Sequence, residues 1–268
     1  MIHLAGVVGE QACAVDPAAA WSINVTGTEA ALQAASDSGL ERFILMSTCS
    51  NYGVSSPDAV VNESAPLHPL SQYAEAKVQA EKLVLESAAP ACRLVLRFGT
   101  ICGLSARMRF DLLVSEMARA AALGEPISIF APAAWRPFLH VRDAARAIEH
   151  CLSTPSELLH GKVFNVVGEN CQKRHLVQIV QKHYPDTPIE ITEKRPDLRD
   201  YRVSAERIER ETGFTATLSV EDAFLETAAA VASGVFRDPK WPGHSAVPLH
   251  PELLRNGIPA AAIQGNRE

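Results

Sequence analysis

The sequence predicts an α/β fold built on a parallel sheet, because strand-like and helix-like patterns alternate along it. Three short apolar runs of the kind found in buried strands lie at residues 2–5, 42–46 and 93–97. Two stretches with apolar side chains at helical spacing separate these runs, at residues 24–36 and 73–84. Parallel strands need such crossover helices, so we expect the three runs to share one sheet.

The ends of these elements carry their own signals. The helical pattern of residues 24–36 stops near Gly39, a residue that favours helix termination. The strand at residues 42–46 runs directly into a polar cluster, Ser-Thr-Cys-Ser, at residues 47–50. Open α/β sheets place their functional side chains at the carboxyl ends of strands, so this cluster is a candidate site.

The second half of the sequence predicts a smaller α+β lobe made of residues 170–236, to which residues 101–139 contribute. Residues 176–183 and 220–232 have apolar side chains at helical spacing. Residues 189–191 are typical of a short strand.

The C-terminal segment has a different character. Prolines at positions 239, 242, 248, 251 and 259 interrupt every potential helix, and the apolar periodicity is lost. We therefore expect residues 237–268 to form a loosely ordered tail.

Composition restricts the partners and the compartment. The chain of 268 residues carries a formal net charge of −6, which argues against nucleic acid and anionic membranes as partners. Its six cysteines are scattered without a CxxC or metal-ligand spacing, so we expect reduced thiols and no metal site. No apolar run has the length of a membrane helix and no signal-peptide pattern is visible, so a cytoplasmic location is expected.

Tyr73 and Lys77 form a YxxxK motif, and Thr48 lies 25 residues before the tyrosine. Positions i and i+4 share one face of a helix, so the phenol and the ammonium can address the same small volume. A fixed positive charge lowers the pKa of a phenol, which at about 10 is otherwise too high for a base at neutral pH. The hydroxyl of Thr48 could hold a reacting oxygen beside the phenol. The motif alone occurs often by chance, so its weight depends on its context.

Several further motifs occur in an order that resembles the extended short-chain dehydrogenases/reductases, in particular the NAD-dependent sugar-nucleotide epimerase/dehydratase group. The resemblance covers most of residues 1–230 and rests on HLAG at 3–6, NVTGT at 24–28, STCSNYG at 47–53, SQYAEAK at 71–77, RFGTICG at 97–103, WRPFLHVRDAARA at 135–147, FNVVG at 164–168 and KRPDLRDYRVS at 194–204. It implies an incomplete, Rossmann-like dinucleotide-binding domain in residues 1–169, truncated at its N-terminus. It also implies that the smaller lobe binds substrate.

The resemblance assigns roles residue by residue. The catalytic positions match Thr48, Tyr73 and Lys77. The positions that contact the NAD cofactor match Ala5, Gly6, Asn24, Ser47, Tyr73 and Lys77. The positions that contact the nucleotide-sugar substrate match Ser50, Thr100, Arg109, Arg136 and Arg195, and the last two arginines would clamp its diphosphate. Many relatives pair through the helices beside the active site, so a homodimer is also implied as possible.

One feature of the family is absent from this sequence. A dinucleotide fold opens with a glycine-rich turn that runs directly into a helix and presents backbone N–H groups to the pyrophosphate. The segment GVVG at residues 6–9 resembles such a turn, but Asp16-Pro17 is the expected helix start, seven residues after Gly9. Comparison with the family suggests that about 60 to 75 residues precede Met1. We therefore expect a fragment, or a misplaced start, that binds nicotinamide cofactor weakly or not at all.

The residues after Thr48 favour one reaction over another. A 4,6-dehydratase of this family carries Asp-Glu directly after the active-site threonine, whereas Cys49 and Ser50 follow it here. The resemblance therefore favours an epimerase like UDP-glucose 4-epimerase, in which Tyr73 removes a hydroxyl proton while hydride moves to the nicotinamide and later returns. A sugar-nucleotide reductase or dehydrogenase with the same three residues is an alternative. A catalytically incompetent binding or partner subunit is another.

Overall fold

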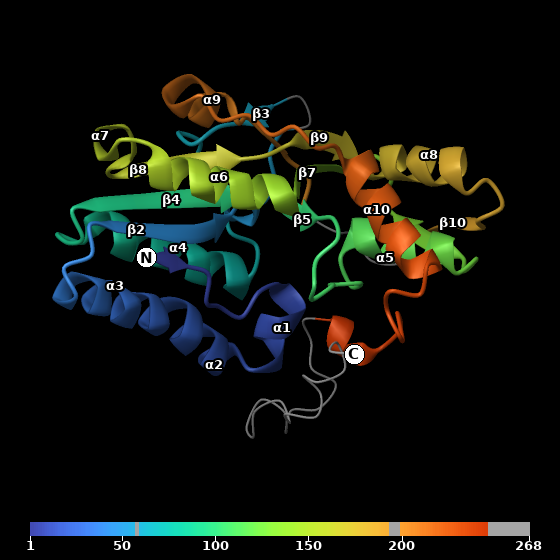
Figure 1. Ribbon diagram of the computed structural model, residues 1–268, viewed down its shortest axis with the longest axis horizontal. Coiled ribbons are helices and arrows are strands. Elements are labelled where there is room, and N and C mark those ends of the chain that lie inside the picture. The colour runs from blue at the N-terminus through green and yellow to red at the C-terminus, as the bar shows by residue number, and fades with distance from the viewer. Residues whose placement is uncertain (57–58, 193–198, 246–268) are drawn as a thin grey trace.

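The computed structural model describes residues 1–56, 59–192 and 199–245, and a four-stranded sheet lies at its centre (Figure 1). The strand order is β1 (Ile2–His3), β2 (Arg42–Thr48), β4 (Cys92–Phe98), β8 (Lys162–Val166). All three neighbouring pairs are parallel, and Thr48 at the end of β2 lies opposite Phe98 at the end of β4. The predicted α/β fold with a parallel sheet is confirmed.

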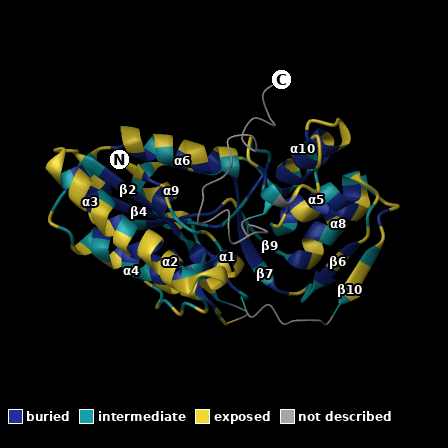
Figure 2. Cartoon of the chain, turned by 90° about the horizontal axis from the view of Figure 1, so that it is seen from below, coloured by how far each residue is buried: buried dark blue, intermediate teal, exposed yellow. Residues whose placement is uncertain are grey.

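Helices cover both faces of this sheet. They are α3 (Gly27–Asp37) and α4 (Gln72–Glu86) on one face and α6 (Val141–Ser153) on the other. Phe43 and Leu45 of β2 pack in the cluster with α3 and α4, whereas Ile44 and Met46 pack in the cluster with α6. Every position of the strand core is therefore apolar, which explains its continuous hydrophobic run. Figure 2 shows the strands buried between helices whose outer faces are exposed.

The smaller lobe contains two short sheets and three helices. Its elements are β5 (Thr100–Cys102), β6 (Ile127–Phe130), β7 (Trp135–His140), β9 (Glu169–Gln172), β10 (Ile189–Thr192), α5 (Leu113–Ala122), α8 (Lys173–His183) and α10 (Val220–Ala232). One apolar core that includes Met117, Ile179 and Phe224 joins the three helices. The predicted helices and short strand of this region are present, whereas the exact domain boundaries remain predictions.

The segment around residues 200–203 lies next to the residues that follow β2, although the two are far apart in the sequence. The short elements of this region are η2 (Cys49–Tyr52), β3 (Val60–Val61), β11 (Arg202–Val203) and α9 (Glu206–Thr212). A further short helix, α7 (Ser156–Leu159), precedes β8. β3 pairs with β11 in parallel, and the backbone N–H of Ser55 donates to the carbonyl of Asp200 at 3.0 Å. Tyr201 therefore packs with Cys49 and Tyr52, next to the polar cluster that follows β2.

The segment after β1 differs from the prediction. α1 (Glu10–Val15) begins directly after Gly9, and α2 (Pro17–Trp21) follows, capped by the carboxylate of Asp16. The expectation that the first helix starts at Asp16-Pro17 was therefore wrong. Gly9 has a φ of 95°, which glycine adopts readily, and α1 has six residues with no side-chain cap, so it left no start signal in the sequence. The stretch predicted as a helix at residues 24–36 begins with a π-helical turn, η1 (Ser22–Thr26).

The described part of the predicted tail makes specific contacts. Within it, η3 (Pro242–His244) lies against the loop before α5, and the carbonyl of His244 accepts from the backbone N–H of Phe110 at 2.9 Å. The ring of Phe110 also meets that of Phe236 edge to face at 5.2 Å. Residues 246–268 lie outside the described residues. Among the described helices, none combines the length and the apolar character that a membrane crossing needs.

Candidate active site

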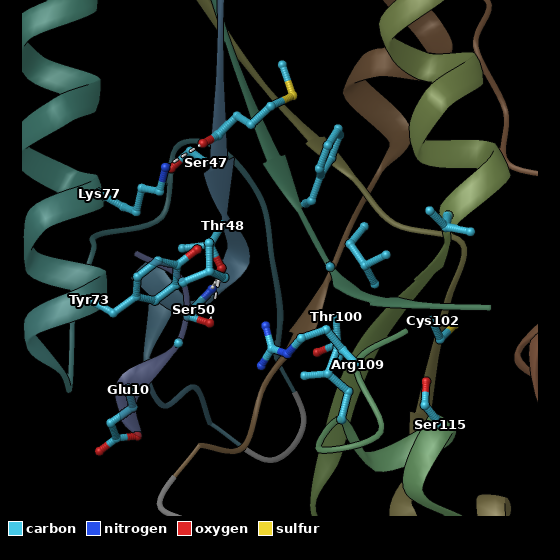
Figure 3. Close-up of a pocket in the computed structure, with 18 of the residues that line it drawn as sticks. Glu10, Ser47, Thr48, Ser50, Tyr73, Lys77, Thr100, Cys102, Arg109 and Ser115 are labelled. Atoms are coloured by element: carbon cyan, nitrogen blue, oxygen red, sulfur yellow. Dashed lines mark hydrogen bonds between the residues drawn. The ribbon is translucent and has the colours of Figure 1, made fainter. Parts of the chain in front are cut away.

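A cavity of about 570 Å³ opens where the carboxyl ends of β2 and β4 face the smaller lobe. Seven of the predicted site residues line it, namely Ser47, Thr48, Ser50, Tyr73, Lys77, Thr100 and Arg109. Figure 3 shows Tyr73 and Lys77 projecting from α4 toward Thr48 at the end of β2, with Thr100 and Arg109 on the opposite side. Open α/β sheets bind ligands at this position.

α4 presents a phenol and an ammonium group to the cavity from one face. The hydroxyl of Ser71 caps the start of the helix, which places Tyr73 in its first turn. Lys77 lies one turn later, is 4% exposed, and donates from Nζ to the carbonyl of Met46 at 2.9 Å. Burial lowers the pKa of Lys77, and the carboxylate of Glu81 counteracts this effect. The structure therefore brings together the two groups that the YxxxK spacing indicated.

Thr48 lies beside the phenol of Tyr73. Burial raises the pKa of Tyr73 well above its usual value, while hydrogen bonding by the Thr48 hydroxyl and the charge of Arg109 act in the opposite direction. Thr48 Oγ1 also accepts from the backbone N–H of Ser50, and the two hydroxyl oxygens lie 3.1 Å apart. The phenol therefore keeps its proton here, and a further positive charge is needed to make it a base at neutral pH.

A buried ion pair joins α4 to the sheet behind the cavity. Glu81, one turn after Lys77, accepts three hydrogen bonds of 2.6 to 3.2 Å from Arg97 of β4. The same carboxylate accepts from the hydroxyl of Ser47 at 2.5 Å and from the amide of Asn51 at 2.8 Å. The side chains of the pair are only 4% and 6% exposed. This network fixes α4 relative to β2 and β4, and it engages the Ser47 hydroxyl that was predicted to contact the cofactor.

Asn24 holds the turn that follows β1. Its amide oxygen accepts from the backbone N–H of Val7 at 2.8 Å, and its amide nitrogen donates to the Val7 carbonyl at 2.9 Å. A Cβ on Gly6 would lie 2.8 Å from that oxygen, so glycine is the residue that fits without a shift. Ala5, Gly6 and Asn24 are not among the residues that line the cavity, whereas Val8 of the same turn is. Their contact with a cofactor remains a prediction.

Two of the three arginines predicted to contact the substrate lie within the described residues, and their positions differ. Arg109 lines the cavity and is paired with Asp111 through two hydrogen bonds of 2.7 Å. Arg136 is buried, is not part of the cavity lining, and donates to the carbonyl of Arg199. Arg195 lies outside the described residues. Of the two described arginines, the structure brings Arg109 to the cavity.

Sequence reasoning missed several residues of the cavity lining. Tyr201 is 3% exposed and lines the cavity close to the end of β2, where it packs with Cys49 and Tyr52. Arg199 also lines the cavity, as do Met108 before α5 and Ser115 within it. Arg199 and Tyr201 are two residues apart, a spacing typical of side chains on one side of an extended segment, but this spacing does not indicate which site the segment reaches.

The fold and the cavity together define a class of protein. In this α/β fold the phenol of Tyr73, the ammonium of Lys77 and the hydroxyl of Thr48 line one cavity of ligand size. Such groups are typical of enzymes that transfer a proton to or from a bound ligand. A sequence model of the NAD dependent epimerase/dehydratase family matches residues 1–167, and the chain belongs to this family.

Individual relatives agree with this assignment. The chain is 28% identical over 148 residues to an uncharacterized UDP-glucose epimerase of Bacillus subtilis, a match that covers 54% of this chain and 45% of the relative. It is 26% identical over 251 residues to the dTDP-glucose 4,6-dehydratase of Streptomyces griseus, covering 85% and 70%. Among solved structures, MoeE5 in complex with UDP-glucose and NAD is 25% identical with a TM-score of 0.76, covering 88% and 79%. The chain thus spans less than half the length of the Bacillus relative.

Proposed function

We propose that this protein epimerises a nucleotide sugar by transient hydride transfer to NAD, in the manner of a UDP-glucose 4-epimerase. The observation that carries the proposal is the convergence of Tyr73, Lys77 and Thr48 on one cavity at the strand ends. Similarity to a UDP-glucose epimerase and to a structure that holds UDP-glucose and NAD supports the choice of substrate and cofactor. The six cysteines are free and buried, which supports a cytoplasmic location.

The residues of the cavity fit the nicotinamide end of NAD. Lys77 has three ammonium donors, and the bond to Met46 uses one of them, so others can serve a ribose hydroxyl at the cavity. The turn at Gly6, held by Asn24, passes close to the same ammonium, with 3.8 Å between a Cβ placed on Gly6 and Nζ. NAD, when bound, supplies the hydride acceptor and the positive ring charge that favours a phenolate. Within the described residues, the turn before α1 does not match a pyrophosphate-binding turn, because this six-residue helix begins with Glu10, whose charge opposes a phosphate.

Tyr73 would act as the proton acceptor for a sugar hydroxyl and return the proton after the ketone turns over. Burial raises the pKa of its phenol even with Lys77 in place, so the positive charge of a bound cofactor ring would have to bring it down. Thr48 would hold the reacting oxygen beside the phenol at the cavity.

The groups that follow Thr48 disfavour a dehydratase. Cys49 is buried, donates from Sγ to the carbonyl of Arg97 at 3.3 Å, and has a pKa raised by burial, so it is not poised as an acid or base. Ser50 offers only a hydroxyl. Among the described lining residues the one carboxylate is Glu10, which Figure 3 shows pointing away from Tyr73. The elimination of water from a sugar needs an acid and base pair that these residues do not supply.

The nicotinamide absorbance distinguishes this function from its alternatives. With UDP-glucose and millimolar NAD, an epimerase yields UDP-galactose with no net change in absorbance. A reductase or dehydrogenase, which would use the same three residues, changes it in proportion to product. Absence of both signals in a sample that binds the nucleotide sugar would favour a binding or partner subunit. Isothermal titration is expected to show NAD binding weaker than micromolar, and tight binding would contradict that expectation.

A further inference from the structure

Residues 236–244, which we call the strap, pack against the loop that precedes α5. The carbonyl of His244 accepts a hydrogen bond from the backbone N–H of Phe110 at 2.9 Å. The rings of Phe236 and His244 each meet the ring of Phe110 edge to face, with centroids 5.2 Å apart in both pairs. Phe110 is 6% exposed. Two rings and one backbone hydrogen bond of the strap therefore hold it in place.

The strap is also attached at the other end of α5. Lys240 forms an ion pair with Glu125, which lies three residues after that helix, and Glu125 in turn pairs with Arg119 of α5 at 3.0 Å. Phe236 packs in one apolar cluster with Phe110 and with the last turn of α10. The strap thus contacts the residues on both sides of α5, and Figure 1 shows η3 beside the loop before it.

The loop held in this way forms part of the cavity. It joins β5 to α5 over residues 103–112, and several of its residues line the cavity, among them Ser105, Arg107, Met108 and Arg109. Arg109 directly precedes Phe110, and consecutive Cα atoms lie only about 3.8 Å apart. The position of the Phe110 backbone therefore determines where the Arg109 side chain starts. Figure 3 shows Arg109 on the side of the cavity opposite Tyr73.

We propose that Phe236 and His244 are positioning residues for Arg109: by holding Phe110, they keep the Arg109 guanidinium where it can meet the diphosphate of a nucleotide sugar. The inference rests on the proposed function for the identity of this ligand. Bidentate binding of a phosphate requires a guanidinium of fixed orientation. The ion pair of Arg109 with Asp111 joins two residues of the same loop, so this pair does not anchor the loop to the rest of the protein.

The His244 ring acts through its shape in this proposal, so another aromatic ring can replace it. His244→Phe keeps a ring edge to face with Phe110, whereas His244→Ala removes the ring and keeps the backbone carbonyl. Val235→Ala is the matched control, because Val235 directly precedes the strap and is 66% exposed.

Amide hydrogen exchange in the protein without ligands tests whether the strap holds the loop. We expect the Phe110 amide to exchange about three- to tenfold faster in His244→Ala than in the wild type, because the ring packed on Phe110 is lost. His244→Phe and Val235→Ala should exchange at the wild-type rate. Unchanged exchange in His244→Ala, or equally fast exchange in His244→Phe, overturns the proposal.

Titration with UDP tests whether the held loop positions Arg109. We expect His244→Ala to bind UDP about threefold more weakly, with wild-type affinity in His244→Phe and Val235→Ala. Added to Arg109→Met, His244→Ala should cause no further loss, because the side chain that the strap positions is already absent. Unchanged affinity in His244→Ala, or full additivity of the two losses, overturns the proposal. If the wild type does not bind UDP, the proposed function fails, and exchange of the Phe110 amide still decides whether the strap holds the loop.

Discussion

The two walls of the cavity are built differently. The inner wall comprises Ser47, Thr48, Ser50, Tyr73 and Lys77, and the outer wall comprises Cys102, Ser105, Met108, Arg109 and Ser115. The inner wall stands on β2 and α4, which the buried Glu81–Arg97 pair ties together. The outer wall comes from β5, the loop after it and α5, where the ion pair of Arg109 with Asp111 is 23% exposed on each side.

Under the proposed function, this difference predicts that the inner wall serves proton transfer and the outer wall serves substrate binding. Proton transfer needs groups held within a fraction of an ångström, and a buried, fully paired network on regular elements provides that. Substrates of one family differ in sugar and base, and a loop with partly exposed charges can accommodate such variation. We therefore expect changes in the inner wall to affect turnover or stability strongly, and changes in the outer wall to affect substrate affinity mildly.

Replacement of the phenol should have the largest effect. Tyr73→Phe removes the proton acceptor but keeps the ring, so we expect turnover to fall by about 100- to 10,000-fold with substrate affinity nearly unchanged. Epimerisation of the nucleotide sugar at saturating substrate measures this, with Tyr184→Phe as the control. Undiminished turnover in a folded Tyr73→Phe protein would show that the assignment of the base is wrong.

Breaking the ion pair behind the inner wall should have the next largest effect. Glu81→Leu leaves the charge of Arg97 buried without its partner, which costs about 3–5 kcal/mol in the free energy of unfolding. Urea unfolding followed by circular dichroism measures this difference. Glu75→Gln, on the exposed face of the same helix, should change stability by about 0.5 kcal/mol or less. Equal stability of the two variants would contradict the role given to the network.

A carboxylate that joins α6 to the smaller lobe should give a smaller, pH-dependent effect. Asp143 is fully buried and accepts from the backbone N–H groups of Thr217 and Leu218, both at 2.8 Å. Burial disfavours its charge, but these bonds and Arg146 outweigh burial and hold its pKa below the ordinary value. We expect Asp143→Asn to cost about 1.5–3 kcal/mol at neutral pH.

The sign of the pH effect follows from the lowered pKa of Asp143. Its stabilisation is present above about pH 4, the value for an unfolded aspartate, and is lost as pH falls through the lower folded value. The wild type should therefore approach the stability of Asp143→Asn in acid, as measured by urea unfolding at several pH values. Asp37→Asn on the exposed end of α3 is the control. A gap between wild type and Asp143→Asn that stays constant down to pH 2 would contradict this interpretation.

The outer wall should show the smallest effects, in affinity rather than turnover. Arg109→Met removes a guanidinium whose charge is already shared with Asp111, so we expect KM for the nucleotide sugar to rise about three- to tenfold. Asp111→Asn should act in the opposite direction and lower KM, because it frees the guanidinium. A large loss of kcat in either variant would place Arg109 with the catalytic groups and remove the contrast between the walls.

The residues of the inner wall were easier to predict from the sequence than the rest of the cavity lining. Tyr73 and Lys77 are four residues apart on one helix, and Thr48 ends a strand whose apolar run is evident, so local periodicity was enough to place them. The parallel sheet and the helices of the smaller lobe were predicted from similar patterns. Local patterns do not encode which distant segment returns to a site, so Tyr201 and Ser115 were missed.

The start of α1 and the position of Arg136 also differ from the sequence-based expectation, because both depend on contacts between distant segments. α1 depends on the positive φ of Gly9 and on contacts with α4 rather than on a cap or an apolar stripe, so its start was not predictable. Arg136 matched a family motif, but its guanidinium is engaged by the backbone around Arg199, a contact between segments far apart in the sequence. Burial and partners of a charged side chain are tertiary properties that its sequence context does not fix.

The fate of the hydrogen on the reacting carbon tests the central claim most directly. The protein is incubated with millimolar NAD and UDP-glucose deuterated at C4, and the UDP-galactose formed is analysed by mass spectrometry. Transient transfer to the nicotinamide predicts that the product retains the deuterium, and that Tyr73→Phe slows its formation by about 100- to 10,000-fold. A product that has exchanged the deuterium for solvent hydrogen would contradict hydride transfer and the role of Tyr73 as the base that accompanies it.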